Sequence, residues 1–119
     1  MTDREIEQSL IRSSKLLLEG HTNRRLLEAI LSEFGNLSKA FVIDWIPEQG
    51  EDIYTVVVPP DTVAIVEVSR DDGAPEMPLI QRVPFDQYRR RTRGTTKEMR
   101  RALAVLGRLL RQRFPATRG

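Results

Sequence analysis

The chain has 119 residues, of which 39% are hydrophobic and 30% charged, a balance typical of one folded domain and not of a disordered segment. It contains no cysteine and one histidine, which excludes disulfides, thiolate catalysis and cysteine–histidine zinc sites. The formal net charge of +2 conceals two opposite parts: residues 1–81 carry seven basic and fifteen acidic side chains, a net of −8, whereas residues 82–119 carry twelve and two, a net of +10.

Two amphipathic helices are predicted at the start of the chain. Thr2 and Glu5 have the spacing of a capping box, and apolar residues recur at helical spacing over residues 3–19. Asn23 can cap a second helix, which Gly35 ends. Because only about four residues connect the two helices, we expect them to lie antiparallel as a helical hairpin.

The apolar period then changes from helical to alternating, which indicates strands. Phe41, Ile43 and Trp45 alternate with Val42 and Asp44, so the first three are predicted to share one face of a strand. Further strands are expected at residues 53–58 and 63–69, with a short edge strand at residues 79–83. The short turns between consecutive strands favour an antiparallel meander of three to four strands.

The clearest element is the last helix. A short helical segment over residues 84–91 precedes it and ends in arginines. Thr95 and Glu98 repeat the capping-box spacing, and a long helix is predicted from about residue 96 to residue 113.

These elements predict a single α+β domain over residues 1–119, with residues 115–119 as a frayed tail. In this fold the small antiparallel sheet is packed by the N-terminal helical hairpin and the long C-terminal helix. Both faces of the central strands are apolar, so helices of the chain or a second protein must cover them. A homodimer or a partner surface is therefore one expectation. The chain shows no signal peptide or membrane-spanning run, and a cytoplasmic protein without a membrane partner is the default expectation.

Acidic side chains in two turns form the first candidate surface. Alternate turns of a meander lie at the same edge of the sheet, so we expect an acidic rim that steers a basic protein partner. Trp45 adjoins this rim and is a candidate anchor for the same partner, although core packing is the alternative for it and ordinary turn chemistry the alternative for the acids. The candidate partner-binding residues are Trp45, Glu48, Glu51, Asp52, Asp71 and Asp72.

The basic face of the last helix forms the second candidate surface. Five cations fall within an arc of about 100° when successive residues are rotated by 100°, and more arginines lie just upstream. Such a stripe suits contacts to nucleic-acid phosphates, whereas an acidic protein, or a solvated face paired with the chain's own carboxylates, is the alternative. The candidate nucleic-acid-binding residues are Arg89, Arg90, Arg91, Arg93, Lys97, Arg100, Arg101, Arg108 and Arg111.

Catalytic patterns are weak throughout the sequence. His21 lies in a predicted loop, no nucleophile elbow or glycine-rich phosphate loop is present, and Asp61 with Glu67 is a thin carboxylate pair. We therefore expect no cofactor, metal or catalytic residue. The leading hypothesis is a non-catalytic protein-binding domain, such as a small inhibitor, immunity-type or adaptor protein. A nucleic-acid-binding protein acting through residues 89–111 is the alternative, and an enzyme using carboxylates alone is the third hypothesis.

Overall fold

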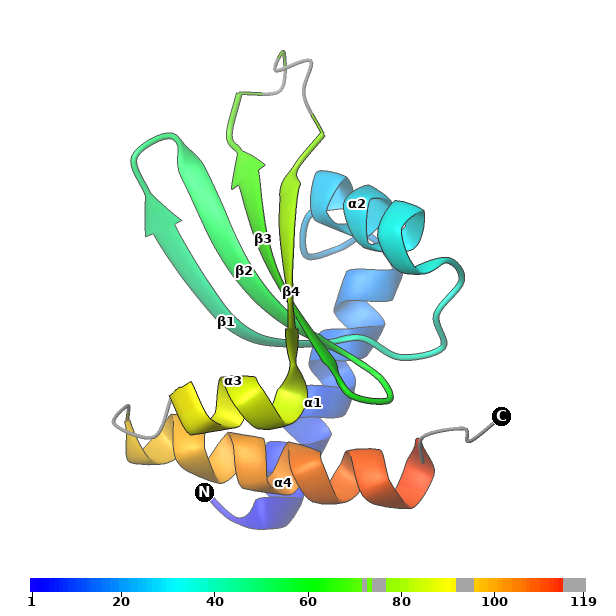
Figure 1. Ribbon diagram of the computed structural model, residues 1–119, viewed down its shortest axis with the longest axis vertical. Helices are drawn as coiled ribbons and strands as arrows, with labels where there is room; N and C mark the ends of the chain where they lie inside the picture. Colours follow the sequence, from blue (N-terminus) through cyan, green and yellow to red (C-terminus); the bar gives the residue numbers. More distant parts are fainter. Residues whose placement is uncertain (72, 74–76, 92–95, 115–119) are drawn as a thin grey trace.

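The computed structural model describes residues 1–71, 73, 77–91 and 96–114 of the chain. The elements, in chain order, are α1 (Asp3–Leu18), α2 (Arg24–Phe34), β1 (Phe41–Glu48), β2 (Glu51–Val58), β3 (Thr62–Ser69), β4 (Leu79–Pro84), α3 (Phe85–Arg91) and α4 (Lys97–Arg113). The strands form one antiparallel sheet in the order β1-β2-β3-β4 (Figure 1). The predicted α+β class and the antiparallel meander are confirmed. The tail at residues 115–119 lies outside the described residues.

Side-chain caps fix where the helices begin. The Thr2 hydroxyl accepts a hydrogen bond from the Glu5 N–H, and the Glu5 carboxylate accepts one from the Thr2 N–H, so the predicted capping box is present. Asn23 caps α2 by accepting from the Leu26 N–H at 3.0 Å. The cap of α4 is Thr96, whose hydroxyl accepts from the Met99 N–H at 3.2 Å; the sequence-based choice of Thr95 was one residue too early, and Thr95 itself lies outside the described residues.

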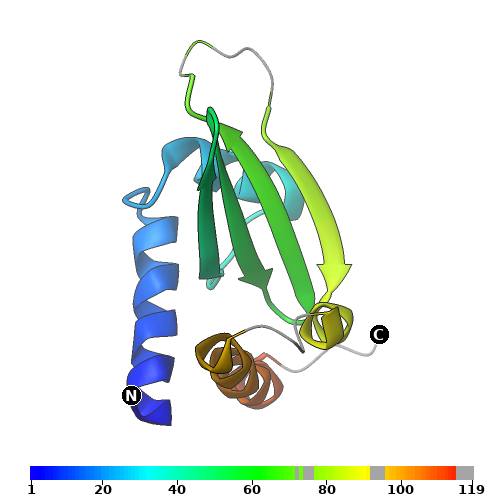
Figure 2. The ribbon, with the colours of Figure 1, turned by 90° about the vertical axis from the view of Figure 1, so that its left-hand side faces the viewer.

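The first two helices follow one another closely but diverge in space. α1 packs mainly against β1 and α4, whereas α2 crosses to the other face of the sheet and contacts β3 (Figures 1 and 2). The short connection was predicted correctly, but the antiparallel packing of the two helices was not. The reason is that the sheet offers each helix a larger apolar surface than the other helix does: Leu26 and Ile30 of α2 are fully buried in a cluster with sheet residues such as Val56.

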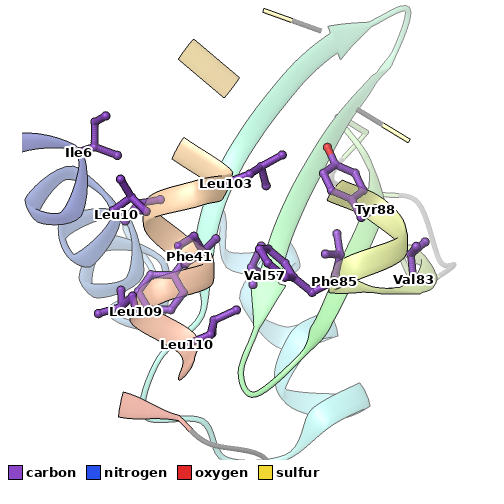
Figure 3. Packing of buried hydrophobic residues seen from close by; sticks show 13 residues of the cluster. Ile6, Leu10, Phe41, Val57, Val83, Phe85, Tyr88, Leu103, Leu109 and Leu110 are labelled. Carbon is purple, nitrogen blue, oxygen red and sulfur yellow. The ribbon is translucent and has the colours of Figure 1, made fainter. Parts of the chain in front are cut away.

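Helices cover both faces of the sheet. On one face α3 and α4 pack against strand residues such as Val57 (Figure 3). On the other face α2 packs against the second cluster. α1 runs along the edge beside β1 and contributes to both clusters, with Ile6 and Leu10 in the first and Leu17 in the second. The chain's own helices thus account for the apolar character of both sheet faces, the observation on which the expectation of a second chain rested.

Side chains of α1 also bond the backbone of the β1 edge. The Ser14 hydroxyl accepts from the Ala40 N–H at 3.0 Å, and the Ser13 hydroxyl accepts from the Val42 N–H at 3.1 Å. Ser14 is fully buried, so its bond satisfies a backbone donor that water cannot reach. These contacts hold α1 against the sheet and fill hydrogen-bonding positions of an edge strand.

A β-bulge in β1 changes the face on which Trp45 lies. Val42 pairs with Val56, but the register shifts before Asp44, which pairs with Thr55, and Trp45 then pairs with Tyr54. One extra residue in a strand reverses the alternation beyond it. The prediction that Trp45 shares a face with Phe41 and Ile43 was therefore wrong.

The turns and the basic helices lie at opposite ends of the molecule. The β1–β2 turn and the C-terminal end of β3 lie at one end of the long axis, and α3 and α4 lie at the other (Figure 1). The principal extents are 40 × 36 × 24 Å. The opposite charges of the two parts of the sequence are only partly separated along the longest dimension, because Asp3 of α1 lies beside Arg101 and Arg108 of α4 and Arg70 lies beside Asp52 of the hairpin.

Candidate interaction surfaces

The end of the β1–β2 hairpin presents an exposed but fixed tryptophan. Trp45 is 56% exposed, and its ring stacks on Tyr54 with ring centroids 6.5 Å apart and an interplanar angle of 17°. Its indole N–H donates to the Asp52 carboxylate at 3.0 Å, and its backbone N–H donates to the Asp44 carboxylate at 3.0 Å. One hydrogen bond of the indole and a stacking partner thus define the orientation of an apolar side chain that the fold leaves largely in water.

Two glutamates face one another at the tip of the same hairpin. Glu48 pairs directly with Glu51 across the tight turn at Gly50, whose φ of +73° suits glycine. Like charges placed directly opposite destabilise a strand pair. On the same strand Ile46 is 47% exposed. The tip therefore combines unfavourable negative charge with exposed apolar surface.

The other predicted acids are neutralised or used by turns. Asp52 accepts two hydrogen bonds from the Arg70 guanidinium, at 3.0 and 3.2 Å, and these bonds together with the Trp45 indole hold the pKa of its carboxyl below the ordinary value of 3.8. The Asp71 carboxylate accepts from the Gly73 N–H. Asp72 lies outside the described residues.

Basic side chains occupy the same end of the molecule. Arg25 donates to the backbone oxygens of Ser69 and Asp71, and a hollow of about 330 Å³ is lined by Arg24, Arg25 and Arg70 beside Asp52. The rim predicted from the sequence is therefore not continuously acidic. Its acidic character is concentrated on Glu48 and Glu51.

The basic stripe of α4 is divided between two neighbours. On the side of α1, Arg101 and Arg108 donate to the two oxygens of the Asp3 carboxylate, at 3.0 and 2.8 Å. Hydrogen bonds from Arg108 and then Arg101 lower the pKa of Asp3 below its ordinary value. A guanidinium nitrogen of Arg113, the last residue of α4, lies 3.8 Å from the carboxylate of Glu7 in α1. This half of the stripe is paired with the chain's own carboxylates, as expected from the sequence-based alternative to a nucleic-acid-binding face.

On the other side, α4 lies against the arginines of α3. Arg89 and Arg90 of α3 and Arg100 of α4 line a shallow hollow of about 410 Å³, together with Asp86 and Leu103. We call this hollow the arginine groove. The remaining candidates Arg91, Lys97 and Arg111 are exposed on α3 and α4, whereas Arg93 lies outside the described residues.

The candidate catalytic residues do not come together. Asp61 precedes β3 and Glu67 lies near its far end, which separates them by about 20 Å at 3.3 Å per residue. His21 is exposed between α1 and α2. Among the described residues, no group of three or more histidine, aspartate or glutamate side chains is arranged to hold a metal ion.

A further hollow of about 620 Å³ lies between α1, β1 and the start of α4. Its lining is mostly apolar and includes Ile6, Leu10 and Met99. Its cations are Lys97 and Arg101, of which Arg101 is bonded to Asp3. This hollow has the volume of many small-molecule sites, and its polar lining residues are Ser9, Thr96, Lys97, Glu98 and Arg101.

Long-range contacts added residues that the sequence did not single out. Tyr54 and Arg70 complete the surroundings of Trp45, and Asp3 divides the basic face. Local patterns give no signal for these roles. Gly107 is different, because a glycine inside an otherwise strong helix indicates a place where another element can approach closely, and Arg89 of α3 lies there.

Among the described residues, none of the helices is long and apolar enough to cross a membrane. Comparisons with protein-family models, curated proteins and solved structures find no match for this chain.

Proposed function

We propose that this chain is a non-catalytic protein-binding domain that engages a basic partner through the end of its β1–β2 hairpin. The hairpin surface consists of both faces of the hairpin near its tip, with Trp45 and Asp52 on one face and Ile46, Glu48 and Glu51 on the other. The observation that carries the proposal is the fixed orientation of the exposed Trp45.

The energetic reason is preorganisation. Tryptophan is among the residues that most often dominate binding energy at protein interfaces. A side chain that must be ordered on binding costs about 0.5–1.5 kcal/mol. Trp45 is already held by Tyr54 and Asp52, so a partner that covers it gains apolar burial at a lower entropic cost.

Charge indicates the chemistry of that partner. Residues 44–52 contain Asp44, Glu48, Glu51 and Asp52 and no basic residue. The positive charge of a lysine- or arginine-bearing partner would offset the repulsion between the opposed glutamates. An arginine of that partner could also stack its guanidinium group on the indole face of Trp45. An inhibitor, immunity-type or adaptor protein is the class of function that such a surface serves.

The test is affinity capture with the purified chain as bait, from nuclease-treated lysate of its own source. The variants are Trp45→Ala and Glu48→Lys/Glu51→Lys, and Leu16→Ala on α1 is the matched control because Leu16 is also an exposed apolar side chain. We expect one polypeptide to be retained by the wild type and by Leu16→Ala and lost from both hairpin variants. Retention by all variants alike, or by none of the baits, contradicts the proposal.

A further inference from the structure

Guanidinium groups from two helices converge on the arginine groove. Arg89 and Arg90 come from α3 and Arg100 from α4, and Asp86 is the one carboxylate in the lining of this hollow. Guanidinium groups present planar donors that match the oxygens of phosphate. A net positive hollow built from two elements is therefore a surface that fits an anionic ligand.

Gly107 shows how closely α3 approaches α4 at this groove. A Cβ atom at position 107 would lie 3.2 Å from Arg89 Nη1 and 3.6 Å from Phe85 Cε1. Glycine inside a helix costs about 1 kcal/mol relative to alanine. The absence of a side chain lets the Arg89 guanidinium lie against the surface of α4.

Gly107 also marks a place where positive charges are crowded. Arg111 Nη1 lies 3.6 Å from the same Cβ position, so guanidinium groups of α3 and α4 point at one spot. Like charges held together in this way raise the local potential, and a bound anion lowers it.

The α1 side of α4 differs from the side that meets α3. Arg101 and Arg108 are bonded to Asp3, whereas Arg111 reaches the spot on α4 beside Gly107 that Arg89 of α3 also reaches. Together with the lining of the groove, these side chains place more arginines than carboxylates where α3 and α4 meet.

The length of the basic row favours a polymer over a small phosphate compound. From Arg100 to Arg111 the row on α4 spans about 17 Å at 1.5 Å per residue. Phosphates along one strand of a duplex follow one another about every 3.4 Å along its axis. Arg100 and Arg111 at the two ends of this span, with the arginines of α3 beside them, can therefore meet more than one phosphate of a strand.

The aromatic residues near the groove favour a duplex over a single strand. Tyr88 and Phe85 of α3 are only 9% and 5% exposed, and their rings pack into the core (Figure 3). Proteins that bind single strands stack bases on exposed aromatic rings, and α3 offers none among its described residues. Contacts to the phosphate backbone of a duplex need no such rings.

We infer that the arginine groove binds the phosphate backbone of double-stranded nucleic acid, without reading its sequence. This inference concerns the end of the molecule opposite to the hairpin surface and does not rest on the proposed protein-binding function.

The test is fluorescence anisotropy with a labelled DNA duplex of about 20 base pairs, roughly two helical turns, in salt from about 50 to 200 mM. The groove variant is Arg90→Gln/Arg100→Gln. Its matched control is Arg101→Gln/Arg108→Gln, which removes the same charge from the side of α4 that Asp3 neutralises. Arg90→Gln alone, at an exposed position outside both cores, is the variant that leaves folding unaffected.

We expect the double groove variant to bind at least about tenfold more weakly than the control and to lower the slope of log K against log salt by about two, because each lost phosphate contact removes about 0.9. Arg90→Gln alone should reduce the steepness of the slope of log K against log salt by about one. The duplex should bind with the same affinity whatever its sequence, and Trp45→Ala should bind it like the wild type.

Four results would overturn the inference. They are no duplex binding in low salt, equal weakening in the groove and control variants, tighter binding of a single strand of the same length, and competition by poly-L-glutamate as effective per charge as that of unlabelled duplex. The last result would assign the groove to an acidic protein.

Discussion

The two ends of this molecule carry opposite charge and hold it by different means. At the hairpin end, Glu48 and Glu51 oppose one another on a tight turn, and Trp45 is fixed by a few contacts at the surface. At the helical end, the arginines stand on helices whose other sides are buried in the core, with Leu106 fully buried behind them. The hairpin end therefore projects into solvent, whereas the helical end is packed against the hydrophobic core.

The comparison teaches that a charge count along the sequence does not describe a surface. Of the acids predicted to form a rim, Asp52 is bonded to Arg70 and Asp71 serves its own turn. Of the basic stripe, Arg101 and Arg108 share Asp3. What remains for a partner at each end is smaller and more localised than the sequence indicates.

The largest expected effect is a difference in the free energy of unfolding between a substitution at the helical end and one at the hairpin end. Leu106→Ala should lower the free energy of unfolding by about 2–5 kcal/mol, because it leaves a cavity between α4 and the sheet. Trp45→Ala should lower it by less than about 1 kcal/mol, because more than half of the indole is already in water. Chemical denaturation of both variants measures the difference. A Trp45→Ala cost similar to that of Leu106→Ala would make Trp45 a structural residue and remove the basis of the hairpin surface.

A pH titration examines the hairpin end alone. Hydrogen bonds from Arg70 and Trp45 lower the pKa of Asp52, so the stabilisation they give is complete above the ordinary value of 3.8 and is lost as the pH falls through the lowered pKa. Trp45 is the single tryptophan of the chain, and its fluorescence should change with a midpoint below pH 3.8. The control is Asp52→Asn, which should lack this transition while its far-ultraviolet circular dichroism stays native. A midpoint above 3.8 in the wild type would contradict the contacts of Asp52.

Gly107→Ala examines the packing of the helical end. Alanine favours the helix by about 1 kcal/mol, and the nearest obstacle is the end of the flexible Arg89 side chain at 3.2 Å. We expect a gain in thermal stability worth less than about 1 kcal/mol, because Arg89 must move away. The same movement should weaken duplex binding slightly. A loss of stability would show that α3 cannot yield at this contact.

The smallest effect is expected from Asp3→Asn. This variant tests whether Asp3 neutralises one side of the basic stripe of α4. Removing the carboxylate releases Arg101 and Arg108 and raises the net charge of the helical end by one. The melting temperature should fall by little, because exposed ion pairs contribute weakly. Duplex affinity at low salt should rise by a few-fold and return to the wild-type value at high salt. No rise at low salt would mean that the paired side of α4 lies too far from the ligand to matter.

Local patterns were sufficient for most of the fold. The capping residues Thr2 and Asn23, the helical and alternating apolar periods, and the turn residues predicted every helix and strand to within about three residues of its bounds. The order of the strands followed from the short turns. These features depend on neighbours in sequence, and the sequence contains them directly.

The surfaces depend on contacts that local patterns cannot carry. A single bulge before Asp44 moved Trp45 to the other face of β1, and nothing in the composition of the strand signals it. The ion pairs of Asp3 join residues 98 and 105 positions apart. The sequence therefore indicates which charged residues lie at each end but not which of them are paired with one another, because those pairs form between residues far apart in the chain.

The hydrogen bonds along β1 have a consequence for assembly. The N–H groups of Ala40 and Val42 are bonded to serines of α1, that of Trp45 to Asp44, and Pro47 has none. An incoming strand would find these donors already used, which disfavours strand addition at β1 and leaves β4 as the more available edge of the sheet. Occupied edge donors of this kind oppose repeated edge-to-edge pairing of the folded sheet.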